Sequence, residues 1–283
     1  MAGGKTGQPA GKVNDARMFW VPGFSGVRML RATFTSYAYE RHTHGEYVIG
    51  AVERGVQRFF HKGGNHYAQP GKVFSINPDE VHAGEAALET GYTYRAVYVG
   101  EDVLSDVFAD VPGAERPRYF HAPDVTDPEL AARLTSALRL LENPGSEALE
   151  AQSRFVLCLR DLFNRYAGAD GAARIDGSGR MAAALREYLD ANAASGVSLD
   201  ALAEYAGLSK YYVLRTFKAA TGMAPHAYLV QRRVELARRA LERGAAPAEA
   251  ALLAGFTDQS HMTRRFKAIH GITPGAYRRL LNG

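Results

Sequence analysis

The sequence predicts a multidomain α+β protein, with an N-terminal antiparallel β barrel, a helical hairpin, and a C-terminal all-α domain that holds two helix-turn-helix units. Three observations predict this class. Short runs rich in Val, Ile, Phe and Tyr alternate with turn residues over 18–99, two leucine-rich helical patterns follow, and the last hundred residues contain a repeat. A chain of 283 residues with 46% hydrophobic content can form two ordinary cores.

The first segment, 1–14, is rich in glycine and polar residues, so we expect a disordered tail. It lacks the apolar run of a signal peptide, and no segment is long enough to span a bilayer. The one cysteine, Cys158, lies in an apolar helical pattern, which excludes an internal disulfide and favours a reducing compartment. We therefore expect a cytoplasmic protein without membrane contacts.

The predicted β domain covers 15–125. Turn signals at 53–55, 62–65, 70–71 and 77–79 separate its short strands, as in an antiparallel sandwich or barrel. Aromatic and histidine side chains on the inner face would line an apolar pocket with a few polar groups, suited to a small organic effector. The expected pocket residues are Trp20, His42, His44, Tyr47, His82, Tyr94 and Tyr98. A shift of one residue in strand register would turn each of them to the opposite face.

Two helical patterns follow over 126–167. The first, 127–142, and the second, 146–166, are separated by Asn143-Pro144-Gly145, which favours an antiparallel hairpin. Their apolar faces could be covered by the sheet or could pair with a second subunit, and the sequence leaves both open. The segment 168–179 is rich in Gly, Ala and Asp and is expected to be a flexible linker.

The C-terminal domain, 180–283, carries one pattern twice. Gly207 and Gly255 are 48 residues apart, and Arg215 and Arg264 are 49 apart. Each copy predicts a helix, a turn at its glycine and a second helix, which together form a helix-turn-helix.

Further signals in the two copies are local. Ser198 and Ser209 are expected to cap the two helices of the first unit, Pro247 to begin the first helix of the second unit, and Thr257 to cap its second helix. The inward positions of both units are expected to form small cores, with Val213, Phe217, Phe256, Met262, Phe266, Ile269 and Ile272.

Charge is distributed unevenly between the domains. Residues 180–283 contain 15 basic and 8 acidic side chains, for a net charge of +7, whereas 1–179 has a net charge of −3. A basic helical module attached to a slightly acidic one indicates that this one domain binds the phosphates of nucleic acid.

The run GFTDQSHMTRRFK at 255–267, followed by GITP at 271–274 and by Tyr277-Arg278, resembles the signature of the AraC family of transcription regulators. The resemblance covers 197–280. It implies two helix-turn-helix units joined by one long helix, here about 227–243, which would hold two recognition helices in successive major-groove segments about 34 Å apart.

The resemblance also implies which side chains meet DNA. Base readers would be Tyr211, Leu214 and Arg215 on the first recognition helix and Gln259, Ser260, Thr263 and Arg264 on the second. Arg can bond two acceptors of guanine, and Gln can do the same with adenine. Phosphate contacts are expected from Lys210, Lys218, Arg265 and Lys267. Two assignments stay open, because Tyr211 could lie along a phosphate and His261 could simply be exposed.

A second, weaker resemblance concerns the β domain. His42-Thr43-His44 before the run 47–52, and the segment 70–78 that leads to His82, resemble the cupin-type effector domain of many AraC-family proteins. The resemblance therefore implies a cupin-like effector-binding domain over 15–125.

In metal-binding cupins a His-x-His pair, a carboxylate and a later His bind one ion. His42, His44 and His82 match three of these ligands, whereas Glu46 lies only two residues beyond His44 and Val48 occupies the usual carboxylate position. The sequence thus favours an organic effector pocket and no cofactor or metal, with a metal site or hydrogen-bonded structural histidines as alternatives.

The favoured function is a non-enzymatic regulator that binds double-stranded DNA and is controlled by a small-molecule effector. The resemblance implies a nucleoid-associated homodimer joined through 126–167 and adds RNA polymerase as a partner. Activation is the expectation, although the residues do not decide between activation and repression. The alternative is a metal-dependent cupin enzyme fused to a DNA-binding module.

Overall fold

The computed structural model describes residues 14–108, 118–168 and 177–281. The tail expected over 1–14 lies outside these ranges except for Asn14, which begins the first strand. Most of the linker expected over 168–179 also lies outside them. Gly168 ends a short strand, and a helix begins at Gly177, inside the segment expected to be the linker.

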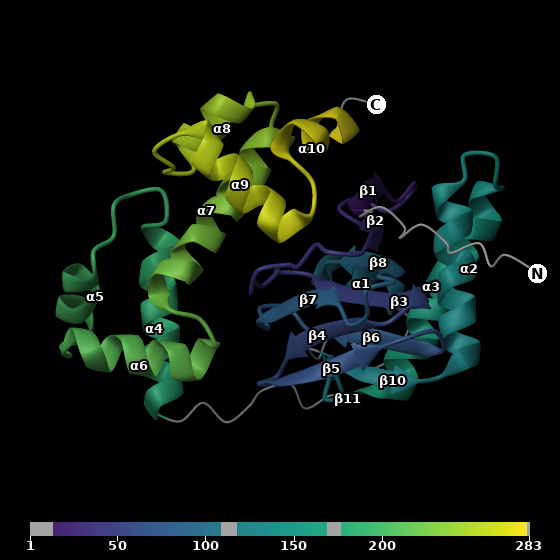
Figure 1. Cartoon of the computed structure of the whole chain (residues 1–283), viewed down its shortest axis with the longest axis horizontal. Coiled ribbons are helices and arrows are strands. Elements are labelled where there is room, and N and C mark those ends of the chain that lie inside the picture. The colour runs from purple at the N-terminus through teal and green to yellow at the C-terminus, as the bar shows by residue number, and fades with distance from the viewer. Residues whose placement is uncertain (1–13, 109–117, 169–176, 282–283) are drawn as a thin grey trace, which may run out of the picture.

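The N-terminal domain consists of antiparallel strands, as predicted. A six-stranded sheet of order β1-β2-β8-β3-β6-β10 packs against a three-stranded sheet of order β5-β4-β7, and β9 pairs with β11 at the edge (Figure 1). The strands are β1 (Asn14–Trp20), β2 (Arg28–Phe34), β3 (Tyr47–Gly55), β4 (Gln57–His61), β5 (Gly64–Ala68), β6 (Lys72–Ile76), β7 (His82–Ala86), β8 (Tyr92–Val99), β9 (Tyr119–Phe120), β10 (Asp124–Thr126) and β11 (Ala167–Gly168).

The two faces of the large sheet bury different clusters, because successive side chains of a strand point to opposite sides. On β8, Tyr94 and Tyr98 face the interior between the two sheets, whereas Val97 and Val99 face the helices. On β3 the same alternation places Tyr47 on the helix side, where its ring packs 5.4 Å from that of Phe163. The prediction that Tyr47 lines the inner pocket is therefore wrong.

Helices cover the other face of this sheet. They are α1 (Glu101–Val107), α2 (Pro128–Glu142) and α3 (Ala148–Tyr166), and α2 and α3 pack together as a hairpin beside the sheet (Figure 1). The side chain of Asp127 caps α2 by accepting a hydrogen bond from the amide of Leu130 at 2.9 Å. The sheet thus covers the buried faces of both helices, and Cys158 is among the buried residues.

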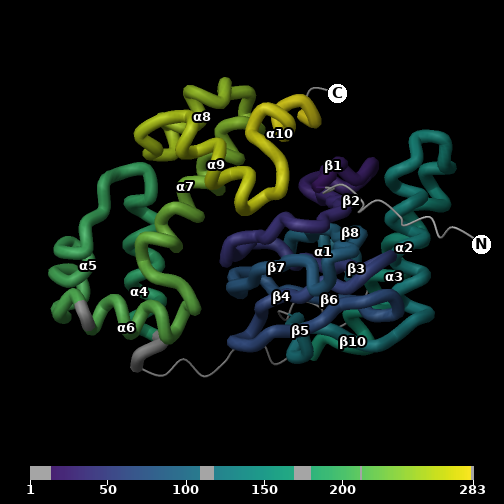
Figure 2. Tube along the Cα trace, viewed as in Figure 1, coloured from purple at the N-terminus to yellow at the C-terminus, as the bar shows by residue number. Residues whose placement is uncertain are grey.

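The C-terminal domain is entirely helical over its described residues. Its helices are α4 (Gly177–Ala191), α5 (Leu199–Ala206), α6 (Lys210–Thr221), α7 (Pro225–Glu242), α8 (Pro247–Leu253), α9 (Gln259–His270) and α10 (Pro274–Leu281). The long helix α7 joins a group made of α4, α5 and α6 to a group made of α8, α9 and α10 (Figure 2). Among the described residues, no helix combines the length and the apolar character that a bilayer span requires.

The two units keep the expected turns. Gly207 and Gly255 adopt positive φ angles of 63° and 79°, a conformation that glycine reaches without the strain a Cβ would add. Ser198 and Ser209 cap α5 and α6 through their side chains. The cap of α9 differs from the expectation, because Asp258 rather than Thr257 accepts a hydrogen bond from the backbone of His261, at 2.7 Å.

Candidate nucleic-acid interface and ligand pockets

Helix α6 presents the candidate DNA face of the first unit. Val213 and Phe217 are fully buried, whereas Leu214, Arg215 and Lys218 are exposed on the other side of the helix. These three of the expected DNA contacts are therefore accessible to a duplex. The side chain of Tyr211 lies outside the described residues, and Lys210 forms an ion pair with Asp200 at 2.5 Å.

Helix α9 presents the corresponding face of the second unit. Gln259, Ser260 and Arg264 are exposed, and Thr263 is half-buried. Beneath them the core side chains Met262 and Phe266 are fully buried. His261 packs edge-on against Phe256 with ring centroids 5.4 Å apart, so this histidine supports the turn of its own unit. The base-reading face predicted for α9 is therefore accessible at its N-terminal half.

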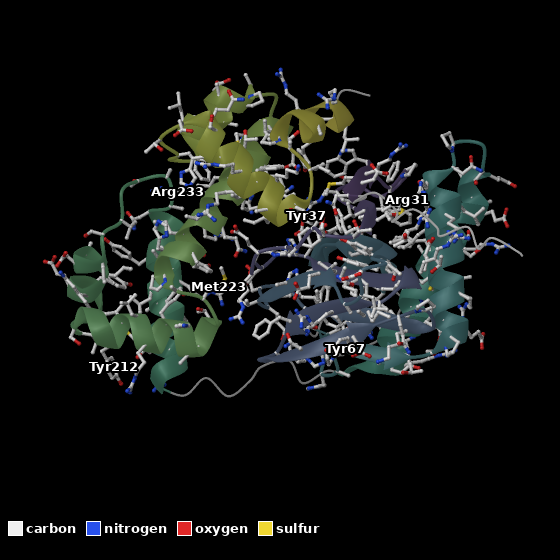
Figure 3. The ribbon with its side chains drawn as sticks, viewed as in Figure 1. Arg31, Tyr37, Tyr67, Tyr212, Met223 and Arg233 are labelled. Carbon is white, nitrogen blue, oxygen red and sulfur yellow. The ribbon has the colours of Figure 1, made fainter. Side chains whose placement is uncertain are left out.

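The C-terminal half of α9 is held by the β domain. Arg265, expected to contact phosphate, instead forms an ion pair with Glu40, with nitrogen–oxygen distances of 2.8 and 3.1 Å. The hydroxyl of Tyr37 donates to the backbone carbonyl of Lys267 at 2.5 Å, and Tyr37 lies where the two domains meet (Figure 3). Met18 of β1 joins the core that α9 forms with α7, α8 and α10. The second unit is thus docked on the β domain through charge, hydrogen bonds and apolar packing.

Three histidines converge inside the β domain. His42, His44 and His82 are buried, and one ring nitrogen from each lies within 4.8 Å of the others. The backbone carbonyls of Glu40 and Glu80 each accept a hydrogen bond from the Nδ1 of the histidine two residues later, at 2.6 and 2.9 Å. In this tautomer the Nε2 atom of each of these two histidines carries a lone pair that can accept a hydrogen bond or bind an ion.

Burial keeps these imidazoles neutral. Desolvation lowers the pKa of His42 to about 4 and the pKa values of His44 and His82 well below their ordinary value. Glu46 does not join the cluster, because its carboxylate is paired with the buried guanidinium of Arg28. Among the described residues the cluster therefore consists of three neutral nitrogen donors without a carboxylate.

The cavity beside the histidines is small. Its volume is about 40 Å³, and its lining includes His42, His44, His82, Tyr94 and Tyr98, five of the predicted pocket residues. Such a space holds a water molecule or two, or a single ion, rather than an organic molecule of several heavy atoms. Trp20, another of the predicted pocket residues, does not line this cavity and lies at the junction with the C-terminal domain.

Comparisons with known proteins agree with both halves of this description. The family model described as an AraC-like ligand binding domain matches residues 24–159, and one described as a helix-turn-helix domain matches residues 202–280. An uncharacterized HTH-type transcriptional regulator, YbfI of Bacillus subtilis, is 30% identical over 224 residues, which cover 79% of this chain and 81% of that protein. The chain belongs to the AraC family of transcriptional regulators.

Other relatives of this AraC-family chain match in part or in fold alone. The right origin-binding protein of Escherichia coli is 39% identical over 93 residues, which cover 32% of each protein. The crystal structure of ToxT from Vibrio cholerae is similar in fold over 95% of this chain and 98% of that one, with a TM-score of 0.55 and 9% identity. Because the family consists of transcriptional regulators, the prediction that the chain is not an enzyme is confirmed, and the cupin-enzyme alternative is discarded.

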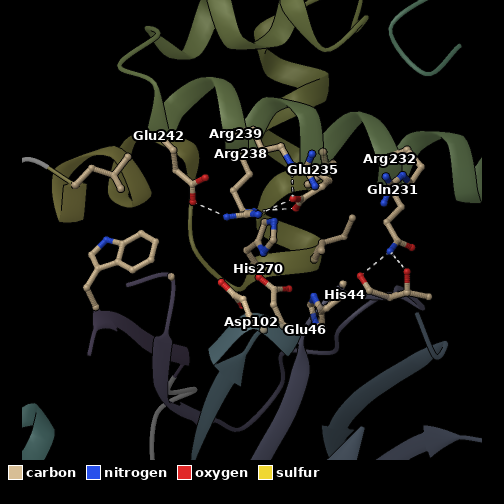
Figure 4. Close-up of a pocket in the computed structure, with 18 of the residues that line it drawn as sticks. His44, Glu46, Asp102, Gln231, Arg232, Glu235, Arg238, Arg239, Glu242 and His270 are labelled. Atoms are coloured by element: carbon tan, nitrogen blue, oxygen red, sulfur yellow. Dashed lines mark hydrogen bonds and ion pairs between the residues drawn. The ribbon is translucent and has the colours of Figure 1, made fainter. Parts of the chain in front are cut away.

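A larger pocket of this AraC-family chain was missed by the sequence interpretation. It has a volume of about 810 Å³ and lies between the β domain and helix α7; we call it the seam pocket (Figure 4). Its α7 wall carries Gln231, Glu235, Arg238, Arg239 and Glu242. The signal in the sequence was the polar stripe at 231, 235, 238 and 242, which runs at helical spacing beside the predicted apolar side of that helix.

Charge pairing holds that stripe in place. Burial by itself would raise the pKa of Glu235, but hydrogen bonds from Arg238 and its charge outweigh burial and lower this pKa to about 2. Arg238 bridges Glu235 and Glu242, so one guanidinium links two turns of α7. Close by, the amide of Gln231 donates to the backbone carbonyl of Thr43 at 2.6 Å and fastens α7 to the β domain.

Proposed function

We propose that this chain is a sequence-specific DNA-binding regulator whose second helix-turn-helix unit is controlled by the β domain. The observation that carries the proposal is the ion pair of Arg265 with Glu40. Arg265 is a predicted contact to DNA phosphate, and here it is paired with a carboxylate of the β domain instead. A molecule bound by the β domain would then act by its different affinity for the docked and the released arrangements. The duplex is proposed to meet α6 and α9 through the predicted residues.

The proposal is tested by Glu40→Gln, which removes the charge and keeps the side chain's shape. Both partners are partly exposed, so we expect a modest gain of about two- to fivefold in affinity for duplexes enriched from a random pool. Fluorescence anisotropy at constant salt measures it. The matched control is Glu85→Gln, which breaks a similarly exposed pair with Arg58 inside the β domain. If the two variants bind DNA equally, Glu40 does not restrain α9.

A second candidate function for the histidine cluster is to hold a divalent metal ion. Three neutral imidazoles favour this candidate, because two of them are oriented by backbone carbonyls in the way that ligating histidines usually are. Titration with Co²⁺, followed by visible absorption, should give one tetrahedral site per chain in the wild type. His82→Gln should abolish that site, and His66→Gln on the outer strand β5 should not. If His82→Gln gives the same Co²⁺ absorption spectrum as the wild type, the three histidines do not hold the ion and the cluster has a structural role.

Homodimerisation and activation are proposed on narrower grounds. On α3, Leu149 is 70% exposed and Leu157 is 61% exposed, so the hairpin keeps apolar surface that a second copy could cover. Light scattering of the full chain with and without Leu157→Lys tests the dimer, which the lysine should weaken.

Activation through RNA polymerase is tested by transcription in a purified system from a promoter that carries an enriched site.

A further inference from the structure

The turn after helix α4 brings the two helix-turn-helix units into direct contact. This turn covers residues 192–195 and follows α4, which shares a core with α5 and α6 of the first unit. Ala194 in the turn lies against Gly255 of the second unit. A Cβ placed on Gly255 would overlap the carbonyl oxygen of Ala194 and lie 2.8 Å from its carbonyl carbon. The two backbones therefore approach more closely than any side chain at position 255 allows.

The corresponding glycine of the first unit has no such neighbour. Gly207 has a φ angle of 63°, close to the 79° of Gly255. A Cβ placed on Gly207, however, would have no heavy atom from elsewhere in the described chain within 4 Å. The left-handed turn accounts for both glycines, whereas the close approach of another backbone concerns Gly255 and not Gly207. The second copy of the repeat thus uses its glycine for a contact that the first copy lacks.

Arg233 of α7 holds the same turn. Its Nε donates to the backbone carbonyl of Ala193 and its Nη2 donates to that of Ser195, both at 2.8 Å. These carbonyls belong to the neighbours of Ala194 on either side, so the guanidinium fixes the residue that meets Gly255. A planar guanidinium with two bonds fixes direction as well as distance. Figure 3 labels Arg233 where the first group of helices approaches the second.

The turn 192–195, Arg233 and Gly255 give the two units a second connection beside α7, and we call these residues the inter-unit bridge. The helix α7 joins the two groups end to end (Figure 2). Long helices curve, so one helix alone holds the groups at its ends less firmly than two connections do. With the bridge, the two groups and the middle of α7 form a closed ring. Such a ring resists both bending of α7 and rotation of one group against the other.

The inter-unit bridge lies wholly within the C-terminal domain. The β domain also touches both units, through Asp79 with Arg186 and through Glu40 with Arg265. In the proposed function α9 leaves the β domain to meet DNA, so contacts with that domain then no longer hold the recognition helices in place. The inter-unit bridge does not depend on those contacts.

We propose that the inter-unit bridge sets the spacing between the two DNA sub-sites that the chain accepts. Arg233 and Gly255 are positioning residues, which act on DNA through α6 and α9. This role rests on the proposed function, in which both helices read one duplex. One added base pair moves a sub-site by about 3.4 Å along the duplex and turns it by about 35°, so two helices at a fixed separation cannot follow it.

The test compares duplexes that differ by one inserted base pair. The full chain is titrated with its enriched duplex and with a series in which the insertion moves along that duplex one position at a time, followed by fluorescence anisotropy at constant salt. For the wild type, an insertion between the sub-sites should weaken binding about tenfold or more, because one unit loses its base contacts. If no central insertion weakens wild-type binding, both this role and the proposed reading by two helices are overturned.

Two variants break the inter-unit bridge at different points. Gly255→Ala forces the backbone at Ala194 to move, and Arg233→Met removes both donors but keeps a long side chain. In each variant, a central insertion should weaken binding by about threefold or less, because the units can then shift to meet both sub-sites. An insertion within either sub-site should cost each variant as much as it costs the wild type.

Each variant has a matched control. Gly207→Ala places alanine in a turn of the same left-handed conformation without the collision. Arg243→Met removes the same charge from the exposed end of α7. Both controls should keep the wild-type dependence on the position of the insertion.

The dependence on insertion position separates this role from a loss of folding. A loss of stability lowers affinity for every duplex by the same factor, and thermal unfolding measures it directly. If Gly255→Ala does not fold, Arg233→Met decides the question. If a central insertion costs either folded variant as much as it costs a spacing-sensitive wild type, the inter-unit bridge does not set the spacing, and the proposed function still stands.

Discussion

The two helix-turn-helix units share a scaffold and differ in their surroundings. In the first unit, Arg215 and Lys218 are exposed and the core cluster consists of residues of the C-terminal domain alone. In the second unit, the core includes Met18 of β1, and Arg265 is paired with Glu40 of the β domain. The first unit also contacts the β domain, through the ion pair of Arg186 with Asp79 at 2.9 Å. Only in the second unit does the core include a residue of that domain and a predicted phosphate contact pair with it, so the two copies keep one fold but differ in how they are docked.

The largest effect should come from removing the matched core aromatic rings. Phe217→Ala and Phe266→Ala should each cost about 3 to 5 kcal/mol of stability, because both rings are fully buried. Only Phe266→Ala should also raise hydrogen exchange in β1, since only its cluster includes Met18. Mass spectrometry of both variants measures this, and equal exchange in β1 would break the comparison.

The next effect concerns base recognition. Arg215→Ala and Arg264→Ala should each relax preference at a different position of the site, by about 1 to 3 kcal/mol of discrimination, because Arg can bond two acceptors of guanine. Binding of each variant to a panel of single-base substitutions measures the loss. A uniform weakening across the panel would show that these two arginines do not read bases.

The smallest effect concerns phosphate contacts. Lys218→Ala and Lys267→Ala should each reduce the slope of log affinity against log salt concentration by about 0.9, the value for one phosphate on a duplex. Both side chains are exposed, so neither change should affect folding. Anisotropy titrations at several salt concentrations test each residue. A lysine whose removal leaves the slope unchanged does not contact phosphate.

Much of the C-terminal domain could be predicted from local signals. Ser198 and Ser209 cap their helices, and Gly207 and Gly255 make the turns, because these effects act within a few residues of one another. The cap of α9 was predicted one residue too early, at Thr257, because Asp258 offers an equally suitable side-chain oxygen at the next position. Cap positions are ambiguous by sequence wherever two capping residues are adjacent.

The β domain was predicted less completely, because a strand's inward face depends on register. His42, His44, His82, Tyr94 and Tyr98 came together in the barrel, but Tyr47 faces the helices. The strand of Tyr47 has buried residues on both faces, so its apolar composition carries no alternation to reveal which side is which.

The sequence alone was enough to predict the helix-turn-helix units, the antiparallel β domain and the family, whereas its assignment of DNA contacts stays a prediction. The tertiary structure alone decided that Trp20 lies in the seam pocket, that Glu40 pairs with Arg265, and that Gln231 fastens α7 to Thr43. The physical reason is distance along the chain. Caps, turns and apolar periodicity are set by near neighbours, whereas these contacts join residues about two hundred positions apart, which only the packing of two domains brings together.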